Sequence, residues 1–215
     1  MRMRRKKHRE DRLENCSEYI VDNFSDYCKD IKNIFPERKN NELHIEIGCG
    51  KGKFINELAL KNPDVNYIAF EKNLDVLVLA AEKAKNAGVS NVKFVPGDVS
   101  ALGEAETETK CSRIYINFCD PWRKTGHAKR RLTHSNFLNI YKNILVGGGE
   151  IFFKTDNKAL FEFSLNSFSD FRLRLRNITL DLHNSGYEGN IMTEYETLFS
   201  EKGNPIYRCE AIFPK

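Results

Sequence analysis

The stretch Ile114-Tyr-Ile-Asn-Phe-Cys-Asp-Pro-Trp122 joins a hydrophobic strand pattern to a carboxylate at its end. Its β-branched and aromatic residues predict a buried strand. The strand is expected to end at Asp120-Pro121, because proline lacks a backbone donor and disfavours helical geometry in the residue before it. Open α/β sheets place their chemistry at the carboxyl ends of their strands. Asp120 and the neighbouring Trp122 are therefore candidate functional residues.

Basic charge is concentrated in two segments of the chain. The loop after this strand contains five basic residues and no acid: Arg123, Lys124, Lys129, Arg130 and Arg131. Residues 1–12 contain seven Lys or Arg and only two acids. Since the formal net charge of the whole chain is +4, the remainder is acidic. This distribution suggests that a polyanion such as a nucleic acid docks on the arm and the loop. A solvated tail and an ordinary surface loop are the alternative.

The composition is typical of one soluble domain. The chain has 215 residues, of which 40% are hydrophobic and 30% charged. Its apolar runs are far shorter than the ~18 residues of a membrane span, and no apolar core follows the basic amino terminus, so we expect neither a membrane segment nor a signal peptide. The six cysteines form no CxxC pair. They are expected to be reduced thiols in a cytoplasmic protein without a structural metal.

Strand and helix patterns alternate along the chain and predict an α/β fold with a doubly wound, mostly parallel sheet. The expected strands are residues 42–47, 66–71, 91–95, 113–118, 150–154, 173–182 and 206–213. The expected helices are residues 53–61, 74–87, 98–102, 135–145, 159–168 and 194–201. Apolar residues between Leu13 and Phe35 recur near helical spacing and predict one or two amphipathic helices. We expect residues 1–40 to form a basic arm and helical extension, and residues 41–215 to form the main domain.

A glycine loop follows the first strand, in the sequence Ile45-Glu-Ile-Gly-Cys-Gly-Lys-Gly52. Gly48, Gly50 and Gly52 permit tight turns and a close approach of a ligand to the backbone. Glu46, just before the loop, is a poor neighbour for a pyrophosphate but a good one for a cationic ligand. The loop is therefore a candidate cofactor site.

Two further acids stand at strand ends. Glu71 ends the second strand, where an acid typically binds ribose hydroxyls, and Asp98 follows the third, where it could accept a hydrogen bond from an adenine amino group. A glycine loop with three such acids fits S-adenosylmethionine, which is cationic and has no phosphate. NAD is the rival cofactor, and solvated strand ends without a ligand are the third possibility.

The central stretch then continues as a longer motif, Phe118-x-Asp-Pro-Trp-x-Lys-x-x-His-x-Lys-Arg-Arg-Leu132. It resembles the signature of the tRNA (guanine-N7)-methyltransferase family. Two further segments also resemble that family: Phe153-Lys-Thr-Asp156 and Thr193-Glu-Tyr-Glu196. The likeness covers essentially the whole chain. It implies a class I methyltransferase fold with a Rossmann-like seven-stranded sheet, and methyl transfer from S-adenosylmethionine to N7 of guanine 46 in the variable loop of tRNA.

The resemblance also implies roles for individual residues. Glu46, Glu71, Asp98 and Asp120 match the family's cofactor-contact positions, and Asp120 also matches its proposed catalytic residue. The family's substrate-contact positions correspond to Lys124, Asp156, Thr193, Glu194, Tyr195 and Glu196. Three residues depart from the family pattern, namely Arg123, Thr125 and Gly126, so the RNA contacts of this loop cannot be transferred directly.

The chemistry of the acceptor explains these residue types. Guanine N7 has a free lone pair, so no general base is needed, and positioning dominates. Asp120 is expected to stabilise the positive charge that develops on guanine, or to anchor an N–H of its pairing edge. Trp122 either stacks on the base, covers the cofactor or lies in the core. His127 is expected to be a loop residue or a phosphate contact.

The basic residues are expected to hold RNA phosphates. In the loop these are Lys129, Arg130 and Arg131, and in the arm they are Arg2, Arg4, Arg5, Lys6 and Lys7. The partners predicted are tRNA but no membrane and no metal, with the chain acting as a monomer or homodimer. Two alternative functions are a methyltransferase of another acceptor, such as adenine N6, and an RNA-binding module that transfers no methyl group.

Overall fold

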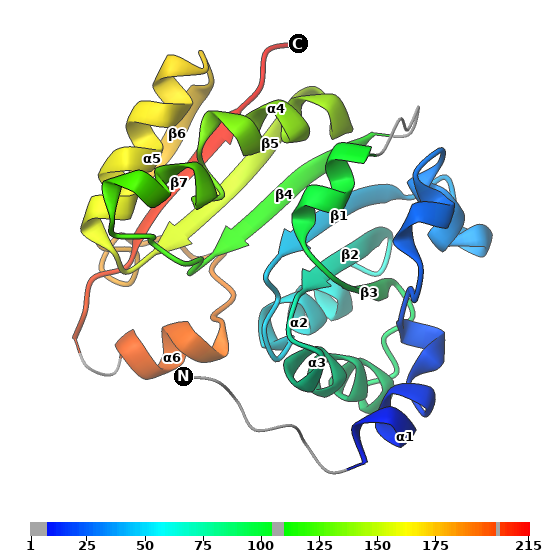
Figure 1. Cartoon of the computed structure of the whole chain (residues 1–215). Helices are drawn as coiled ribbons and strands as arrows, with labels where there is room; N and C mark the ends of the chain where they lie inside the picture. The colour runs from blue at the N-terminus through cyan, green and yellow to red at the C-terminus, as the bar shows by residue number, and fades with distance from the viewer. Residues whose placement is uncertain (1–7, 105–109, 201–202) are drawn as a thin grey trace. The chain divides into compact units, whose positions relative to one another are not determined.

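The computed structural model describes residues 8–104, 110–200 and 203–215 (Figure 1). The chain divides into two compact units, Met1–Thr109 and Lys110–Lys215. The described residues form the seven strands of one mostly parallel sheet, three in the first unit and four in the second.

The first unit contains three parallel strands in the order β3-β2-β1: β1 (Glu42–Ile47), β2 (Val65–Glu71) and β3 (Val92–Pro96). Helices α2 (Lys53–Lys61) and α3 (Leu74–Asn86) connect them, and the 3-10 helix η5 (Val99–Glu104) follows β3. Ile47 pairs with Phe70, and Glu71 pairs with Pro96. The carboxyl ends of the three strands therefore meet at one edge of the sheet.

The amino-terminal segment differs from the predicted amphipathic helices. Only α1 (Arg9–Glu14) is α-helical, and four 3-10 helices follow: η1 (Ser17–Tyr19), η2 (Phe24–Tyr27), η3 (Ile31–Ile34) and η4 (Pro36–Arg38). Several apolar residues, such as Cys16 and Phe24, are buried as the pattern predicts, whereas Leu13 is half-buried. The backbone also pairs with the sheet, because Val21 N donates to Phe94 O at 2.9 Å. Tertiary contacts thus override the helical spacing of the sequence.

The second unit contains four strands in the order β4-β5-β7-β6: β4 (Cys111–Asn117), β5 (Leu145–Thr155), β7 (Tyr207–Ile212) and β6 (Arg174–Thr179). β4 and β5 are parallel, whereas β7 runs antiparallel to both of its neighbours. The connecting helices are α4 (Ser135–Ile144), α5 (Lys158–Asp170) and α6 (Glu194–Ser200), and the basic loop contains the 3-10 helix η6 (Thr125–Arg130).

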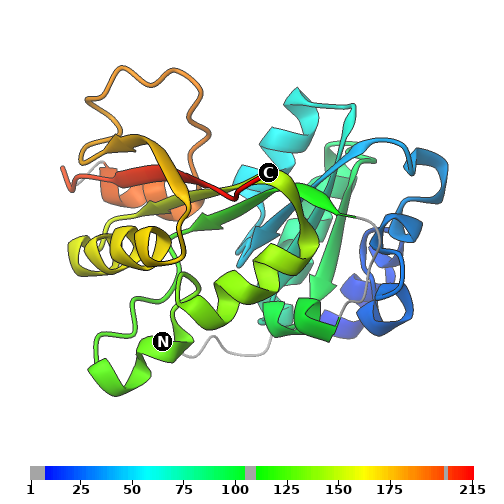
Figure 2. The same cartoon turned by 90° about the horizontal axis from the view of Figure 1, so that it is seen from above.

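The two faces of this four-stranded part carry different side chains. Figure 2 shows α4 and α5 on one side and the orange segment around residues 180–193 on the other. Phe153 packs against Phe161 and Phe168 of α5, with ring centroids 6.2 Å apart in each pair. Because side chains alternate along a strand, the neighbours of Phe153, namely Phe152 and Lys154, point to the opposite face.

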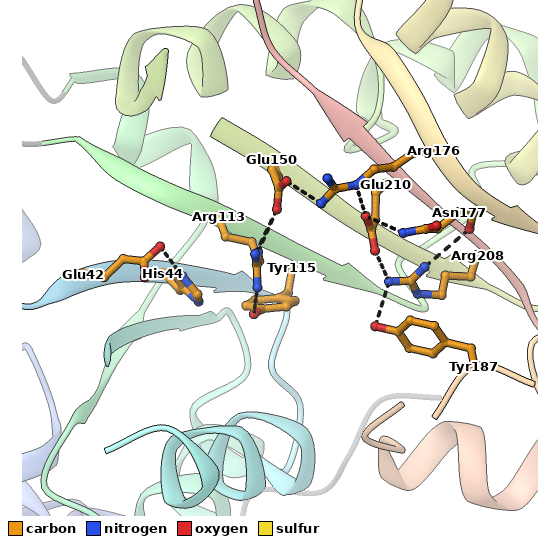
Figure 3. Close-up of polar contacts among 10 residues, drawn as sticks. All are labelled: Glu42, His44, Arg113, Tyr115, Glu150, Arg176, Asn177, Tyr187, Arg208 and Glu210. Atoms are coloured by element: carbon orange, nitrogen blue, oxygen red, sulfur yellow. Dashed lines mark hydrogen bonds and ion pairs between the residues drawn. The ribbon is translucent and has the colours of Figure 1, made fainter. Parts of the chain in front are cut away.

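That opposite face carries a chain of ion pairs across four strands (Figure 3). Arg113 and Arg176 both contact Glu150, and Arg176 and Arg208 both contact Glu210. Burial raises the pKa of Glu210, but the hydrogen bonds from Arg208 and Arg176 outweigh it and lower the pKa overall. The buried carboxylate therefore stays ionised and paired.

Other predicted boundaries moved by several residues. β5 starts at Leu145 rather than at residue 150 and includes Gly147–Gly149. A Cβ at Gly149 would lie 2.9 Å from Leu145 Cβ, so this glycine allows a close approach inside a strand. The predicted strand at 173–182 is limited to Arg174–Thr179, with a register shift beside Asn177, whose φ is +50°. The helix predicted at 98–102 is the 3-10 helix η5.

Candidate functional site

The glycine loop connects β1 to α2 with three left-handed glycines. Gly48, Gly50 and Gly52 have φ of +76°, +58° and +78°. A Cβ at Gly52 would lie 2.6 Å from Ala80 Cβ of α3, so only glycine allows the loop to pack this closely. A Cβ at Gly48 or Gly50 would meet no atom within 4 Å. These two positions leave room for a ligand to approach the loop.

The amide groups of this loop are already used inside the protein. Gly48 N and Cys49 N donate to Phe70 O at 2.8 and 3.0 Å, and Gly52 N donates to Cys49 O at 3.0 Å. Gly50 N donates to Glu71 Oε2 at 3.1 Å. A pyrophosphate-binding loop instead directs its amide groups at the ligand. The geometry therefore disfavours a dinucleotide.

The acidic side chains at the strand ends are held in defined positions. Glu71 Oε1 accepts from Asn73 N at 2.8 Å while Oε2 accepts from Gly50 N. Each carboxylate oxygen has two lone pairs, so Glu71 retains capacity for hydroxyl donors of a ligand. Glu46 lies on β1 just before the loop and is only 1% exposed.

Asp98 lies beyond the end of β3. It accepts from Ser100 N at 2.7 Å and forms an ion pair with Lys72. Burial raises the pKa of Asp98, but the hydrogen bonds from Lys72 and Ser100 lower it overall. The first unit thus brings Glu46, Glu71 and Asp98 to the edge of the sheet that carries the glycine loop, as the sequence predicted.

In the second unit, the chain leaves β4 through a strained turn. Phe118 and Trp122 have φ of +53° and +42°, which is unusual for bulky residues. Asp120 stands between them and is exposed. Phe118 N donates to Lys154 O at 2.9 Å, and the Phe118 ring lies 5.1 Å from that of Tyr195. Backbone strain of this kind is maintained by surrounding contacts and is concentrated at functional sites.

The basic loop is fastened to the same turn. Arg131 donates through Nε to Pro121 O and through Nη2 to Trp122 O, both at 3.1 Å. Arg130 stacks on the Trp122 ring at 4.9 Å, and His127 meets that ring edge-on at 5.8 Å. Trp122 is half-buried, so it does not occupy the core. Arg131 ties the loop to this turn, and the exposed basic residues of the loop are Arg123, Lys124, Lys129 and Arg130.

A second acidic group lies after β5. Tyr195 donates its hydroxyl to Asp156 Oδ2 at 3.1 Å and stacks on Phe199 at 4.1 Å. Burial, with the charge of Asp156 and the hydrogen bond to it as smaller causes, raises the pKa of Tyr195 to about 12. The phenol is therefore a stable donor at neutral pH. The structure brings the two segments predicted to bind substrate, Asp156 and Thr193–Tyr195, together.

Glu196 differs from the residues before it, because its side chain is fully buried. Its Oε2 accepts from Lys154 Nζ at 2.7 Å and its Oε1 accepts from Asn190 Nδ2 at 2.6 Å. His183 Nε2 lies 3.3 Å from Oε1. A direct contact between Glu196 and substrate stays a prediction, and this burial favours an indirect role. Of its partners, Lys154 lies in the Phe153–Asp156 motif but was assigned no role, and Asn190 and His183 carried no local signal of function.

Three further predictions concern the amino-terminal arm, a metal ion and a membrane. The arm residues Arg2, Arg4, Arg5, Lys6 and Lys7 lie outside the described residues. Within the described parts of the chain, no three His, Cys, Asp or Glu side chains are grouped to hold a metal ion. No described helix is long and apolar enough to cross a membrane.

The fold is that of the class I methyltransferases. Over 84% of this chain, the structure titled "Structure of an Antibiotic Related Methyltransferase" superposes with a TM-score of 0.60 at 18% identity, covering 92% of that chain. The 16S rRNA methyltransferase KamB superposes with a TM-score of 0.61 at 13% identity, covering 85% of this chain and 94% of that one. These likenesses concern the fold alone.

Sequence comparison identifies the family within the methyltransferases. A family model described as putative methyltransferase matches residues 40–209. A protein of Clostridioides difficile (strain 630) named tRNA (guanine-N(7)-)-methyltransferase is 49% identical over 211 residues, 98% of each chain. A protein of the same name from Listeria monocytogenes serotype 4a (strain HCC23) is 48% identical over 215 residues, the full length of both. The chain therefore belongs to the tRNA (guanine-N7)-methyltransferase family.

Proposed function

We propose that this protein transfers a methyl group from S-adenosylmethionine to N7 of guanine at position 46, in the variable loop of tRNA. The proposal is supported by full-length likeness to relatives named tRNA (guanine-N(7)-)-methyltransferase and by the two sets of side chains described above. The position in tRNA comes from the family resemblance of the Asp-Pro-Trp motif and its basic loop.

The residues at the glycine loop fit S-adenosylmethionine better than NAD. The observation that supports this choice is the use of the loop amides, since Gly50 N donates to Glu71 rather than outwards. Glu71 would accept hydrogen bonds from ribose hydroxyls, Asp98 would accept one from the adenine amino group, and Glu46 would favour a cationic ligand. When bound, S-adenosylmethionine supplies an electrophilic methyl group.

On the acceptor side, the residues must orient a base whose N7 lone pair is already free. Asp120 is exposed at a strained turn and is proposed to stabilise the positive charge that develops on guanine. It would also contact the cofactor, as the family position implies. Lys124, Asp156, Thr193, Glu194 and Tyr195 are proposed to contact the guanosine or its neighbours. Lys129 and Arg130 are proposed to bind phosphates.

The basic arm is proposed to add further phosphate contacts. Its charge, seven Lys or Arg within residues 1–12, supports binding of the tRNA body. The protein would act without a metal, as a monomer or homodimer, in the cytoplasm.

Methyl transfer from tritiated S-adenosylmethionine to unmodified tRNA tests the proposal. Labelled product is expected with a tRNA that has guanine at position 46, and none with the same tRNA carrying adenine there. Aniline-type cleavage at N7-methylguanine then locates the modified base. Labelled tRNA that resists cleavage would indicate a different acceptor atom, such as adenine N6. Binding of tRNA without any transfer would indicate an RNA-binding module.

A further inference from the structure

Lys154 is a buried cation at the carboxyl end of β5, on the face opposite α5. It is 5% exposed and donates from Nζ to three acceptors: Asn190 Oδ1 at 3.0 Å, Ile191 O at 2.9 Å and Glu196 Oε2 at 2.7 Å. An ammonium group has three N–H donors, and three acceptors match them. Lys154 thus binds two parts of the segment that follows β6, namely residues 190–191 and Glu196.

Glu196 is the acidic partner of Lys154 in this buried ion pair. Both of its carboxylate oxygens receive hydrogen bonds, one from Lys154 and one from Asn190. Its backbone N donates to Thr193 Oγ1 at 2.9 Å. The carboxylate is therefore buried inside the unit and paired with Lys154 and Asn190. To meet a substrate, it would have to leave a buried cation unpaired, which is strongly unfavourable.

The residue next to Glu196 faces the proposed substrate groups. Tyr195 is exposed, donates to Asp156 and packs against the ring of Phe118. Phe118 begins the strained turn that presents Asp120. The same lysine also contacts that turn through its backbone, because Lys154 O accepts from Phe118 N. One residue therefore touches both the Asp120 turn and the segment of Tyr195.

We propose that Lys154 and Glu196 are positioning residues: their buried ion pair sets the placement of Tyr195, and through it of Asp156 and the Asp120 turn, without touching the substrate. This inference rests on the proposed function, since it names how that site is held. It assigns Lys154 a role and gives Glu196 an indirect role in place of direct contact.

A double-mutant cycle tests this proposal. Lys154→Met and Glu196→Gln each remove one charge, and the combined variant Lys154→Met/Glu196→Gln removes both. Each single change is expected to lower kcat per folded enzyme on the order of 10- to 100-fold, because small displacements at a reacting site are costly. The Kd for tRNA is expected to stay within about twofold, since the proposed phosphate contacts lie elsewhere. The kcat of the double variant should be higher than that of either single variant, because the double variant leaves no unpaired buried charge.

A matched control is the exposed pair of Lys158 and Glu162, whose charged atoms lie 3.8 Å apart on α5. Lys158→Met and Glu162→Gln are expected to leave kcat unchanged. Assays are made well below the melting temperature of each variant, with the folded fraction measured. If kcat per folded enzyme stays within twofold in both single variants of the buried pair, the role is only structural and the proposal fails. If Glu196→Gln weakens tRNA binding, Lys154→Met does not, and the double variant shows no recovery, Glu196 contacts the substrate directly.

Hydrogen exchange separates this inference from the proposed function. Amides of residues 183–197 are expected to exchange faster in Lys154→Met than in the unaltered chain, and to be unchanged in Lys158→Met. This measurement does not depend on turnover. If the unaltered protein transfers no methyl group, the proposed function fails, whereas normal exchange of residues 183–197 in Lys154→Met overturns the positioning role whatever the activity.

Discussion

Gly50 N donates a hydrogen bond of 3.1 Å to Glu71 Oε2, so the glycine loop is tied to the acid at the end of the neighbouring strand. This contact joins residues 21 positions apart in sequence. It consumes an amide that a pyrophosphate would need and fixes the carboxylate that would bind a ribose. This hydrogen bond therefore favours S-adenosylmethionine, which has no phosphate, over a dinucleotide.

Glu71→Gln is expected to weaken binding of S-adenosylhomocysteine by about 10- to 150-fold, because a hydrogen bond to a charged group contributes roughly 1.5–3 kcal/mol. Isothermal titration calorimetry measures the Kd. Glu37→Gln changes an exposed acid in the same unit and should leave the Kd unaltered. Equal affinity of the Glu71 variant and the unaltered protein would contradict the assignment, and so would stabilisation by NADH but not by S-adenosylhomocysteine.

Asp120→Asn is expected to lower kcat about 100- to 1000-fold, in line with the loss of one electrostatic stabiliser in a reacting site. Binding of tRNA should change little, because the charge on guanine develops only during transfer. Single-turnover transfer of tritiated methyl groups measures the effect. Asp170→Asn, an exposed acid on α5 of the same unit, is the control. Full activity in the Asp120 variant would refute its catalytic role and leave family membership intact.

Replacing Lys124, Lys129 and Arg130 together by alanine is expected to weaken tRNA binding and to flatten its salt dependence. Each lost phosphate contact should reduce the slope of log K against log salt by about 0.7–0.9. Filter binding at several salt concentrations gives the slope. The control is a triple replacement of exposed bases elsewhere in the unit, Lys142, Lys158 and Arg174. An identical slope for both triple variants would show that the loop does not neutralise phosphates.

Replacement by lysine is expected to lower kcat at Arg131 but not at Arg130. Its guanidinium bridges two backbone carbonyls, which a lysine cannot do with the same geometry. Arg131→Lys should therefore lower kcat about tenfold, because the Trp122 turn loosens, while the salt slope of tRNA binding stays the same. Arg130→Lys keeps the exposed charge and should change neither quantity. An unchanged kcat in Arg131→Lys would contradict this role, because lysine keeps the charge but cannot bridge the two carbonyls in the same way.

The free energy of unfolding is expected to fall as pH rises from about 9 to about 12. Burial raises the pKa of both Cys111 and Cys209 from 9.0 to about 12. The unfolded chain therefore loses these protons first, so stability is fully present below pH 9 and is lost as pH approaches 12. Urea unfolding at pH 7.5 to 10.5 measures the slope. In Cys111→Ala/Cys209→Ala the slope should be shallower, and an equal slope would contradict the prediction.

Local patterns predicted much of what the structure contains. Lys53–Lys61 was predicted as a helix with the observed bounds, and Glu42–Ile47 as a strand with the observed bounds. Both are determined by short-range periodicity and by the glycine loop between them. Glu71 and Asp98 were predicted at the same sheet edge, because parallel strands in register bring their carboxyl ends together.

Contacts between distant residues were not predictable in this way. The helical spacing of Leu13–Phe35 is replaced by 3-10 turns, and Val21 pairs with Phe94. Arg131 also donates to the Trp122 carbonyl, a contact that the sequence did not predict, while its binding to a phosphate stays a prediction. Lys154 and Glu196 are 42 residues apart, and no local pattern marks either as half of a buried pair.

The sequence by itself determined the strand and helix order, the glycine loop and the family to which this chain belongs, because those features are written in spacing and residue type. Only the tertiary structure decided which charges are buried against each other and which face solvent. The reason is physical: an ion pair such as Lys154 and Glu196 forms where folding removes both groups from water, and that depends on how β5 and α6 come together.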